Sequence, residues 1–288
     1  MNPISIEVIQ KGMSVGKKYK VMDATGAAYL CRLFPKDQYD SIQQDYSYLQ
    51  KFLALDIPMC KPIEFGTYKD HAYILQTWID GFDIQETIHT FSEQKQYELG
   101  VQSGVLLQKI HSLPIAEPPE SWEEVFRVKI NNKIHAYEYS KVQIAGGHAF
   151  LEYIENNRHW VKNRPRVWLH GDYHLGNLIV DSANVVYAID FNRGIPCDPW
   201  EDFDRISICA RSSPSFASGM IHGYFNENVP EIFWKLLTLY TSSKMISFLT
   251  WSQYRDDSCV NLITSLSNDV LQWYHNMISD IPSWYFPP

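Results

Sequence analysis

The sequence is poor in cysteine and contains no long apolar run. Its five cysteines are scattered and odd in number, which favours reduced thiols over a disulfide framework. No apolar run approaches the roughly 18 to 20 residues that span a membrane. The N-terminus also lacks the basic segment and apolar core of a signal peptide. Together these absences favour a cytoplasmic protein without a membrane partner.

Positive charge is scarce as well, since the formal net charge is −8. Residues 171–288 carry 13 acidic and 6 basic side chains, whereas residues 1–170 carry 20 and 19. This balance disfavours nucleic acid as a partner. It allows two interpretations: an acidic cleft that concentrates a cationic substrate, or a surface charge that keeps the protein soluble.

Spacings typical of a zinc site are absent among the histidines and cysteines, and so are internal repeats and low-complexity tracts. The chain has 288 residues, of which 45% are hydrophobic and 20% charged. That is ordinary globular composition, and it suffices for one large domain or two smaller ones with a substantial core.

The most informative stretch covers residues 167–191. Two short apolar runs flank a polar loop, a turn follows at residues 181–184, and a third apolar run ends on Asp190. We therefore predict a strand, a loop and a hairpin. The loop contains Asp172 and Asn177, so an acid, an amide and a second acid are expected close together. Each residue alone is typical of an ordinary turn or strand end.

Those three residue types match the needs of phosphoryl transfer. One carboxylate can orient a substrate hydroxyl and accept its proton. An amide oxygen and a second carboxylate can hold Mg²⁺, which prefers few protein oxygens and completes its shell with water and phosphate. The constellation therefore predicts a kinase site rather than a simple turn.

The order of the motifs resembles the signature of the aminoglycoside phosphotransferase and choline kinase family, whose members are relatives of protein kinases. The motifs are His-Gly-Asp at 170–172, Asn177 after four residues, and Ile-Asp-Phe at 189–191. The resemblance implies Asp172 as the catalytic base, with Asn177 and Asp190 as Mg²⁺ ligands.

The resemblance also implies an α+β, two-lobed protein-kinase-like fold. A small antiparallel β lobe over residues 1–80 would bind nucleotide. A larger, mainly helical lobe over residues 81–288 would carry the catalytic loop and the substrate site. The pattern along the chain agrees: a helix is expected at 40–55, with strand candidates at 5–9, 18–22, 28–34, 63–67 and 71–76. A capping box is expected at 90–93, and another at 121–124.

In the N-terminal lobe the resemblance implies several nucleotide contacts. The loop around Ser14 would cover the phosphates, and Arg32 would bind them in place of a family lysine, since arginine is always charged and binds phosphate as a fork. The carbonyl of Thr77 and the N–H of Ile79 would bind adenine. The family expects a glutamate on the helix at 40–55; Asp45 is the carboxylate nearest that place, and its pairing with Arg32 stays open.

In the C-terminal lobe the candidates for substrate contact are acidic. Asp198 and Glu201 follow the metal strand, and the adjacent Asp256 and Asp257 either face a cationic substrate or mark an exposed helix start. The resemblance assigns Asp202 a structural role, tying the catalytic loop into the lobe.

The function implied is Mg²⁺-dependent phosphorylation, by ATP or GTP, of a hydroxyl group on a small cationic molecule. An aminoglycoside antibiotic is the first choice of acceptor, while a macrolide, choline, homoserine or an amino sugar fits the same motifs. An Ala-Pro-Glu segment is missing, which disfavours a protein acceptor. The alternative is a nucleotide-binding pseudokinase, suggested by Arg32 and the missing helix glutamate. The oligomeric state stays open.

Overall fold

The computed structural model describes residues 3–10, 16–115, 120–191 and 194–287, and the chain divides into two units. We call Met1–Asp83 with Asn177–Asn192 the β unit, and Ile84–Gly176 with Arg193–Pro288 the helical unit. The linear division expected between residues 80 and 81 thus differs from the grouping by contacts, because a later hairpin belongs to the β unit.

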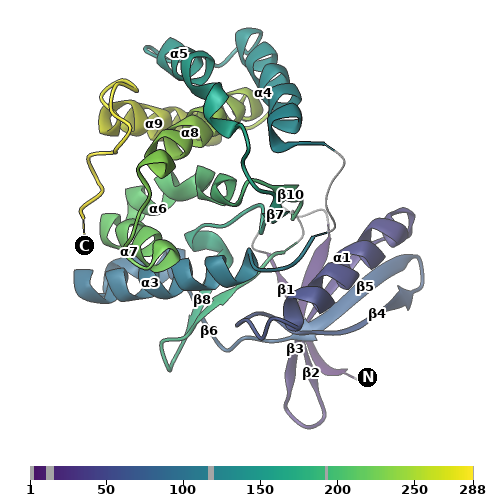
Figure 1. Ribbon diagram of the computed structural model, residues 1–288. Coiled ribbons are helices and arrows are strands. Elements are labelled where there is room, and N and C mark those ends of the chain that lie inside the picture. The colour runs from purple at the N-terminus through teal and green to yellow at the C-terminus, as the bar shows by residue number, and fades with distance from the viewer. Residues whose placement is uncertain (1–2, 11–15, 116–119, 192–193, 288) are drawn as a thin grey trace. The chain divides into compact units, whose positions relative to one another are not determined.

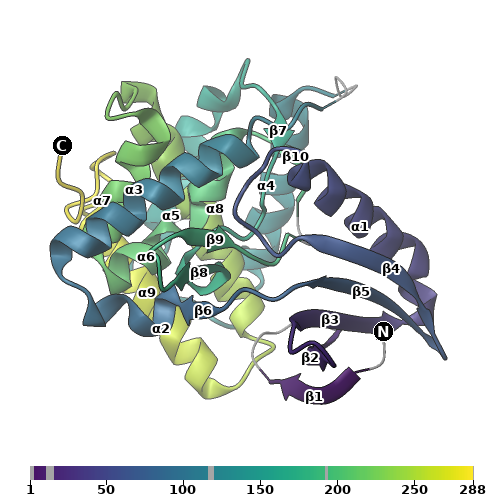
Figure 2. The same ribbon diagram turned by 90° about the horizontal axis from the view of Figure 1, so that it is seen from below.

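An antiparallel sheet with strand order β1-β2-β3-β5-β4 forms most of the β unit (Figure 2). In the turn after β2, the Asp23 carboxylate accepts the N–H groups of Thr25 and Ala27, and Gly26 adopts φ 86°, which glycine tolerates without strain. The bounds lie within two residues of the predicted ones: β1 Pro3–Ile9, β2 Lys17–Asp23, β3 Ala28–Pro35, β4 Pro62–Tyr68 and β5 His71–Thr77.

One helix, α1 (Tyr39–Leu53), packs against this sheet and lies alongside β4 and β5 in Figure 1. It buries Ile42, Leu49 and Phe52, which lie on one face because a helix repeats every 3.6 residues. Each such side chain contributes roughly 1.5–3 kcal/mol of hydrophobic free energy on burial. The predicted helix is therefore confirmed, although it ends two residues early.

A second sheet joins β6 (Gly81–Asp83), β8 (Leu178–Asp181) and β9 (Val186–Ala188) in the order β6-β8-β9. The Asp181 carboxylate accepts N–H groups from the turn after β8, which confirms the predicted hairpin. The Ala188 N–H donates to the Pro58 carbonyl at 3.1 Å. This bond attaches the hairpin to the N-terminal segment and explains its place in the β unit.

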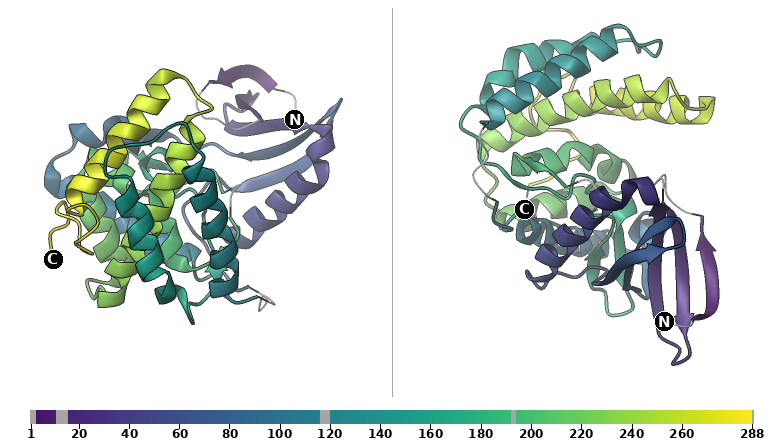
Figure 3. Two further views of the ribbon diagram at one scale, coloured as in Figure 1. Left: turned by 90° about the horizontal axis from the view of Figure 1, so that it is seen from above. Right: turned by 90° about the vertical axis from the view of Figure 1, so that its right-hand side faces the viewer.

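Helices dominate the helical unit, and none in the described part of the chain is long and apolar enough to cross a membrane. Their bounds are α2 Ile84–Thr87, α3 Glu93–Ile110, α4 Trp122–Glu138, α5 His148–Asn157, α6 Ile206–Ser212, α7 Pro214–Phe225, α8 Glu231–Ser252 and α9 Asp257–Trp273. A two-stranded sheet pairs β7 (Val167–Trp168) with β10 (Pro196–Cys197). In Figure 3 (right) the yellow-green α8 runs beside the teal helices α4 and α5.

The two predicted capping boxes have different outcomes. Ser121 and Glu124 form the reciprocal bonds at the start of α4, as predicted. The box predicted at 90–93 is wrong, because the Thr90 hydroxyl donates to the Thr87 carbonyl instead. Helix α3 is capped by Ser92, whose hydroxyl accepts the Lys95 N–H at 3.3 Å.

Helices α3 and α7 lie side by side (Figure 1), and glycines allow their backbones to approach closely. A Cβ atom at Gly104 would lie 2.1 Å from the Met220 carbonyl oxygen and 2.5 Å from the Tyr224 nitrogen. Gly223 faces the Val101 carbonyl in the same way, at 2.1 Å. The interface therefore depends on the absence of side chains at these positions.

We predict that Gly104→Ala destabilises the protein by about 1–3 kcal/mol, because the added methyl group collides with backbone atoms that cannot rotate away. At an unconstrained helical position the same change would gain up to about 1 kcal/mol. Urea unfolding measures the difference, with Val105→Ala as the control, since Val105 is 50% exposed on the same helix. A midpoint for Gly104→Ala at or above the wild-type value would contradict the close packing.

Candidate active site

A single buried carboxylate, Asp202, holds the loop that begins at His170. Its two oxygens accept the N–H groups of His170 and Gly171, each at 2.7 Å. The His111 Nε2 lies 3.0 Å from the same carboxylate. Because buried carboxylates are costly unless several donors satisfy them, this clamp stabilises one loop conformation. Asp202 therefore has the structural role that the resemblance implied.

The loop then turns through Gly171, whose φ of 80° suits a residue without a Cβ atom. Asp172 follows, with its side chain 13% exposed. The Arg205 Nε lies 2.8 Å from its Oδ1, and the His174 Nε2 lies 3.4 Å from the same oxygen. Arg205 also donates to the Gly171 carbonyl at 3.1 Å. Arg205 and His174 thus contact the same oxygen of the Asp172 carboxylate within the helical unit.

The predicted metal ligands belong to the β unit, at one end of the β8–β9 hairpin. The Ile189 N–H donates to the Asn177 carbonyl at 3.0 Å. Asn177, just before β8, and Asp190, just after β9, therefore lie at the same end of the hairpin. An Arg32 nitrogen lies 3.1 Å from Asp190 Oδ1, and the Lys18 ammonium lies 3.8 Å from Oδ2. The structure therefore brings Asn177, Asp190 and Arg32 together, and adds Lys18.

This hairpin end fits a magnesium ion. Asp190 has φ 69°, a conformation that costs free energy in a residue other than glycine and recurs at functional sites. Its carboxylate is 22% exposed and already faces two cations. An amide and a carboxylate are oxygen donors of the kind that Mg²⁺ accepts, with phosphate and water completing its shell.

Asp45 is the carboxylate on α1 that was considered as a partner for Arg32. Burial raises the pKa of the Asp45 carboxyl on α1 to about 6, and the opposing effect of the Arg32 charge, which lowers this pKa, is smaller. Among the described residues, no ion pair within 4.0 Å joins Asp45 to Arg32. Arg32 instead pairs with Asp190 on the hairpin.

The structure describes only two of the three remaining candidate nucleotide-binding residues. Thr77 is the last residue of β5, its hydroxyl accepts the Lys61 N–H at 2.9 Å, and Ile79 is a buried residue just beyond. Their backbone contacts with adenine stay predictions. Ser14 lies outside the described residues.

Asp198 does not face substrate, which corrects the sequence-based expectation. It is 0% exposed and accepts two bonds from the Arg164 guanidinium, at 2.6 and 3.2 Å. It also accepts the Trp200 N–H at 2.8 Å, as the N-cap of a 3₁₀ helix, Pro199–Arg205. With its oxygens occupied inside the core, Asp198 is a structural residue.

Glu201 and Asp204 lie on the same 3₁₀ helix, and each is matched by a lysine. Glu201 is 5% exposed and pairs with Lys129 of α4. Asp204 pairs with Lys244 of α8 at 2.6 Å. The carboxylates at and beside this helix are therefore matched by cations, two of which, Arg164 and Lys129, come from residues 1–170. This pairing weakens the argument for a bare acidic cleft.

Asp256 and Asp257 begin α9, and the Asp256 carboxylate caps it by accepting the Cys259 N–H at 2.9 Å. Both are exposed, and within the described residues neither has a hydrogen bond or ion pair with the catalytic loop. The helix-start interpretation is thus confirmed, and a substrate contact stays a prediction.

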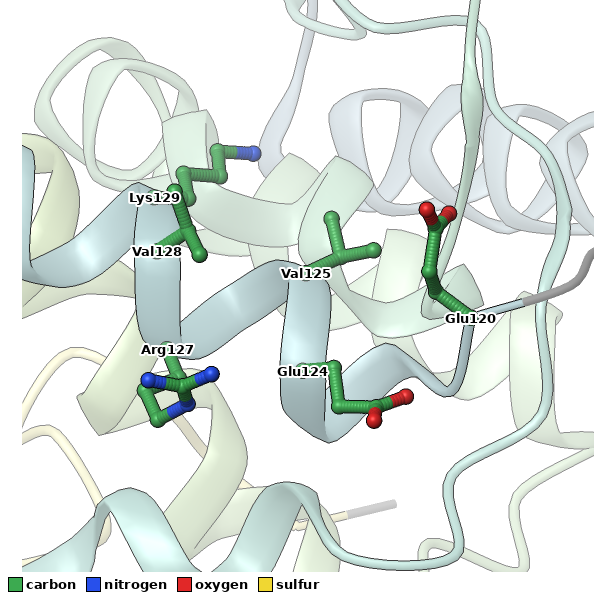
Figure 4. Close-up of a pocket in the computed structure, with 6 residues that line it drawn as sticks. All are labelled: Glu120, Glu124, Val125, Arg127, Val128 and Lys129. Carbon is green, nitrogen blue, oxygen red and sulfur yellow. The ribbon is translucent and has the colours of Figure 1, made fainter.

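Hollows in the described part of the helical unit include two beside α4. One, of about 80 Å³, reaches Gly171 of the catalytic loop, and it is lined by Lys129, Leu169, Gly171, Ile195, Glu201, Asp202, Asp204 and Lys244. The other is an open depression of about 570 Å³ along α4 (Figure 4), lined by Glu120, Glu124, Val125, Arg127, Val128 and Lys129. Lys129 belongs to both, and in Figure 4 its side chain points away from Arg127 and Glu124.

The sequence analysis missed several of these residues. Lys18 could have been found, because it lies opposite Arg32 in the β2–β3 pairing that the predicted hairpin implies. Arg205, Lys129 and Lys244 give no comparable signal. Their roles depend on packing between segments that are far apart in the chain.

A family model and several known proteins are similar to this chain. The family model for the phosphotransferase enzyme family matches residues 5–233. Aminoglycoside 3'-phosphotransferase from Escherichia coli is 24% identical over 232 residues, covering 76% of this chain and 82% of that protein. The enzyme of the same name from Salmonella typhimurium is 23% identical over the same shares.

Solved structures show the same architecture. The GDP complex of an aminoglycoside 2'-phosphotransferase mutant superposes with a TM-score of 0.74 at 14% identity, covering 97% of this chain and 95% of the other. Spectinomycin phosphotransferase with ADP and spectinomycin gives 0.61 at 16% identity, covering 97% and 94%. This likeness confirms the predicted protein-kinase-like fold, with a small antiparallel β lobe and a larger, mainly helical lobe.

We predict that Asp45→Asn stabilises the protein at pH 8 and that most of this gain is lost by pH 4. The pKa of about 6 for Asp45 in the folded protein lies above the ordinary aspartate value of 3.8. The folded protein therefore binds this proton more tightly, so the free energy of unfolding falls as the pH rises from about 3.8 to about 6 and stays lower above that range. Below both values the carboxyl is neutral in either state, as the amide is.

Thermal unfolding between pH 4 and pH 8 measures this difference. Asp40→Asn is the control, since Asp40 is an exposed residue on the same helix and should show no such pH-dependent gain. Equal effects of Asp45→Asn at pH 4 and pH 8 would argue against a raised pKa for Asp45.

Proposed function

This chain belongs to the phosphotransferase enzyme family, and on that premise we propose that it transfers the terminal phosphoryl group of ATP or GTP to a hydroxyl group of a small molecule. One observation carries the proposal: the loop that presents Asp172 is clamped by Asp202 and oriented by Arg205. A clamped carboxylate is suited to positioning a hydroxyl group, and positioning supplies much of the rate in phosphoryl transfer.

In this reaction Asp172 orients the acceptor hydroxyl and accepts its proton. The hydroxyl oxygen forms a bond to the terminal phosphorus, and the bond from that phosphorus to the bridging oxygen breaks. The nucleoside diphosphate leaves with the bonding electrons. Arg205 and His174 hold the Asp172 carboxylate, so that one oxygen is kept in a fixed orientation.

Asn177 and Asp190 would hold Mg²⁺, which neutralises phosphate charge when bound. Arg32 and Lys18 compensate the Asp190 charge, and both cations are also suited to bind phosphate oxygens. We further propose that the N-terminal lobe, including the Ser14 loop and the Thr77–Ile79 hinge, binds the nucleotide. The C-terminal lobe would bind the acceptor.

The acceptor class is suggested by the relatives and limited by the charges. The relatives are aminoglycoside 3'-phosphotransferases by name, which supports an aminoglycoside as the first acceptor to test. The pairing of Glu201 with Lys129 and of Asp204 with Lys244 counts against a polycation. Macrolides, choline, homoserine and amino sugars therefore belong in the same assay.

A second candidate function is nucleotide binding without turnover. It is favoured by the ion pairs of Asp190 with Arg32 and Lys18, which compensate this carboxylate without a metal. Release of nucleoside diphosphate, measured with ATP or GTP and Mg²⁺ across the acceptor panel, separates the two functions. Turnover with any acceptor excludes the pseudokinase.

We predict that Asp172→Asn lowers kcat by about 10²- to 10⁴-fold, because the amide cannot accept the hydroxyl proton. Nucleotide binding, measured as the shift of the melting temperature by Mg²⁺-nucleotide, should persist. A variant with the wild-type rate would show that another group orients the acceptor.

We predict that Asp190→Asn abolishes turnover and weakens Mg²⁺-nucleotide binding while the fold stays intact. A ligand at 100 times its Kd stabilises a protein by about 2.7 kcal/mol, and this Mg²⁺-dependent stabilisation should be lost. Asp70→Asn removes an exposed carboxylate from the same unit and should retain it. If Asp190→Asn bound Mg²⁺-nucleotide as the wild type does, the metal assignment would be wrong.

A further inference from the structure

Four side chains of alternating charge connect α8 of the helical unit to Asp172. The Lys244 ammonium on α8 lies 2.6 Å from Asp204 Oδ2. The other Asp204 oxygen, Oδ1, lies 3.4 Å from Arg205 Nη1. Arg205 Nε in turn lies 2.8 Å from Asp172 Oδ1. Each charge in this series therefore has an opposite charge next to it.

The short 3₁₀ helix Pro199–Arg205 explains how the series is formed. In such a helix, residues three apart lie on the same side. Asp202 and Arg205 share the side that contacts the catalytic loop. Glu201 and Asp204 share the side that meets the lysines of α4 and α8. Because Asp204 and Arg205 are adjacent, they connect the lysine side of the helix to the loop side.

The Arg205 guanidinium is held by contacts at two of its nitrogen atoms. Nε faces Asp172, whereas Nη1 donates to the Gly171 carbonyl at 3.1 Å and lies 3.4 Å from Asp204 Oδ1. The Phe248 ring of α8 lies beside the group, with its centroid 5.9 Å from Cζ. Because a guanidinium is planar and rigid, contacts at two nitrogens determine the orientation of the whole group. Asp204 therefore contributes to the direction from which Arg205 contacts Asp172.

Water screens these charges only weakly, since each of the four side chains is 13% exposed or less. Charges that are partly buried interact more strongly than charges on the surface. Burial alone would raise the pKa of Asp204, but the charges of Lys244 and Arg205 outweigh burial and hold this pKa below its usual value. Asp204 is therefore an ionised carboxylate where it meets Arg205.

We propose that Asp204 and Lys244 are positioning residues of the phosphoryl-transfer reaction and act on Asp172 through Arg205. This role rests on the proposed phosphotransferase function. Asp204 fixes the orientation of the Arg205 guanidinium, and Lys244 holds Asp204 in place. Without the Asp204 charge the guanidinium can rotate, and the Asp172 carboxylate loses the alignment with the acceptor hydroxyl that the reaction requires.

The competing explanation is that the buried pair of Asp204 and Lys244 only stabilises the fold. Removing one member of a buried ion pair leaves the other charge uncompensated, which destabilises a protein under either explanation. A lower melting temperature therefore does not separate the two roles. A positioning role additionally requires a loss of kcat that depends on Arg205.

The first experiment removes the Asp204 charge and measures nucleoside diphosphate release below the melting temperature of each variant. The acceptor is whichever of kanamycin, erythromycin, choline, L-homoserine and glucosamine gives the fastest release with the wild-type protein. Asp204→Asn should lower kcat on the order of 10- to 100-fold, as misplacement of a catalytic group does. KM for the acceptor and the melting shift by Mg²⁺-nucleotide should stay unchanged.

The matched control is Asp269→Asn, which removes a carboxylate from another arginine pair of the same unit, with Arg211 at 3.1 Å. This variant should retain the wild-type kcat. A wild-type kcat in Asp204→Asn would overturn the proposal, and so would a loss that appears only in KM.

A double-mutant cycle tests whether Asp204 acts through Arg205. In the Arg205→Met protein, Asp204→Asn should change kcat by less than about twofold, the range within which independent effects usually add, because the guanidinium that Asp204 orients is gone. Losses that multiply in the double variant would instead show that the two residues act separately, against the proposal.

Lys244 provides a test that does not alter the 3₁₀ helix, and it serves where Asp204→Asn is too unstable to assay. Lys244→Met should lower kcat by less than Asp204→Asn does, with KM unchanged. Lys244→Arg keeps the charge beside Asp204 and should restore the rate. An unchanged kcat in Lys244→Met, or no recovery in Lys244→Arg, would contradict the role of this lysine.

The same assays distinguish failure of the positioning role from failure of the proposed function. Wild-type protein that binds Mg²⁺-nucleotide but releases no nucleoside diphosphate with any of the five acceptors would overturn the phosphotransferase function and the positioning role with it. Turnover by the wild type together with an unchanged kcat in Asp204→Asn would retain the function and overturn the positioning role alone.

Discussion

The helical unit depends on one buried carboxylate, that of Asp202. Its side chain is 1% exposed, so its charge is tolerable only because the His170 and Gly171 N–H groups and the His111 ring surround it. Those bonds determine the path of the loop up to Asp172. Because Asp202 belongs to a short 3₁₀ helix, it also determines where Glu201, Asp204 and Arg205 point, since residues three apart in such a helix lie on one side.

The β unit has a corresponding constraint at Asp190. This residue adopts φ 69° at the end of a hairpin, beside Asn177, where Arg32 and Lys18 compensate its charge. The arrangement stabilises a carboxylate that would otherwise be desolvated without a partner. Arg32 therefore pairs with the hairpin rather than with a helix carboxylate of the kind expected from kinases, and burial raises the pKa of Asp45.

Charge in this protein has to be interpreted by contact rather than by count. The second half of the chain carries a clear acidic excess, yet Asp198, Glu201 and Asp204 are matched by Arg164, Lys129 and Lys244. Two of these cations come from the half that looked neutral. The acidic composition of this half therefore does not by itself predict an acidic cleft.

The sequence by itself determined the local features of this protein. Strand alternation, the 3.6 period of α1, the Asp181 turn and the order of Asp172, Asn177 and Asp190 are all properties of short segments, and each was predicted within a few residues. The family resemblance extended these to the fold, which the solved structures confirm.

Only the tertiary structure decided which charged side chains form buried contacts with distant residues. Asp198 was expected at substrate and is instead wholly buried against Arg164, 34 residues away in the chain. Lys133 reaches Ser243 across 110 residues. A single sequence without tertiary contacts holds no signal for such pairs, because burial and desolvation depend on which distant segments meet. The chemistry of the catalytic loop was therefore readable from its motif, whereas the charges that surround it were not.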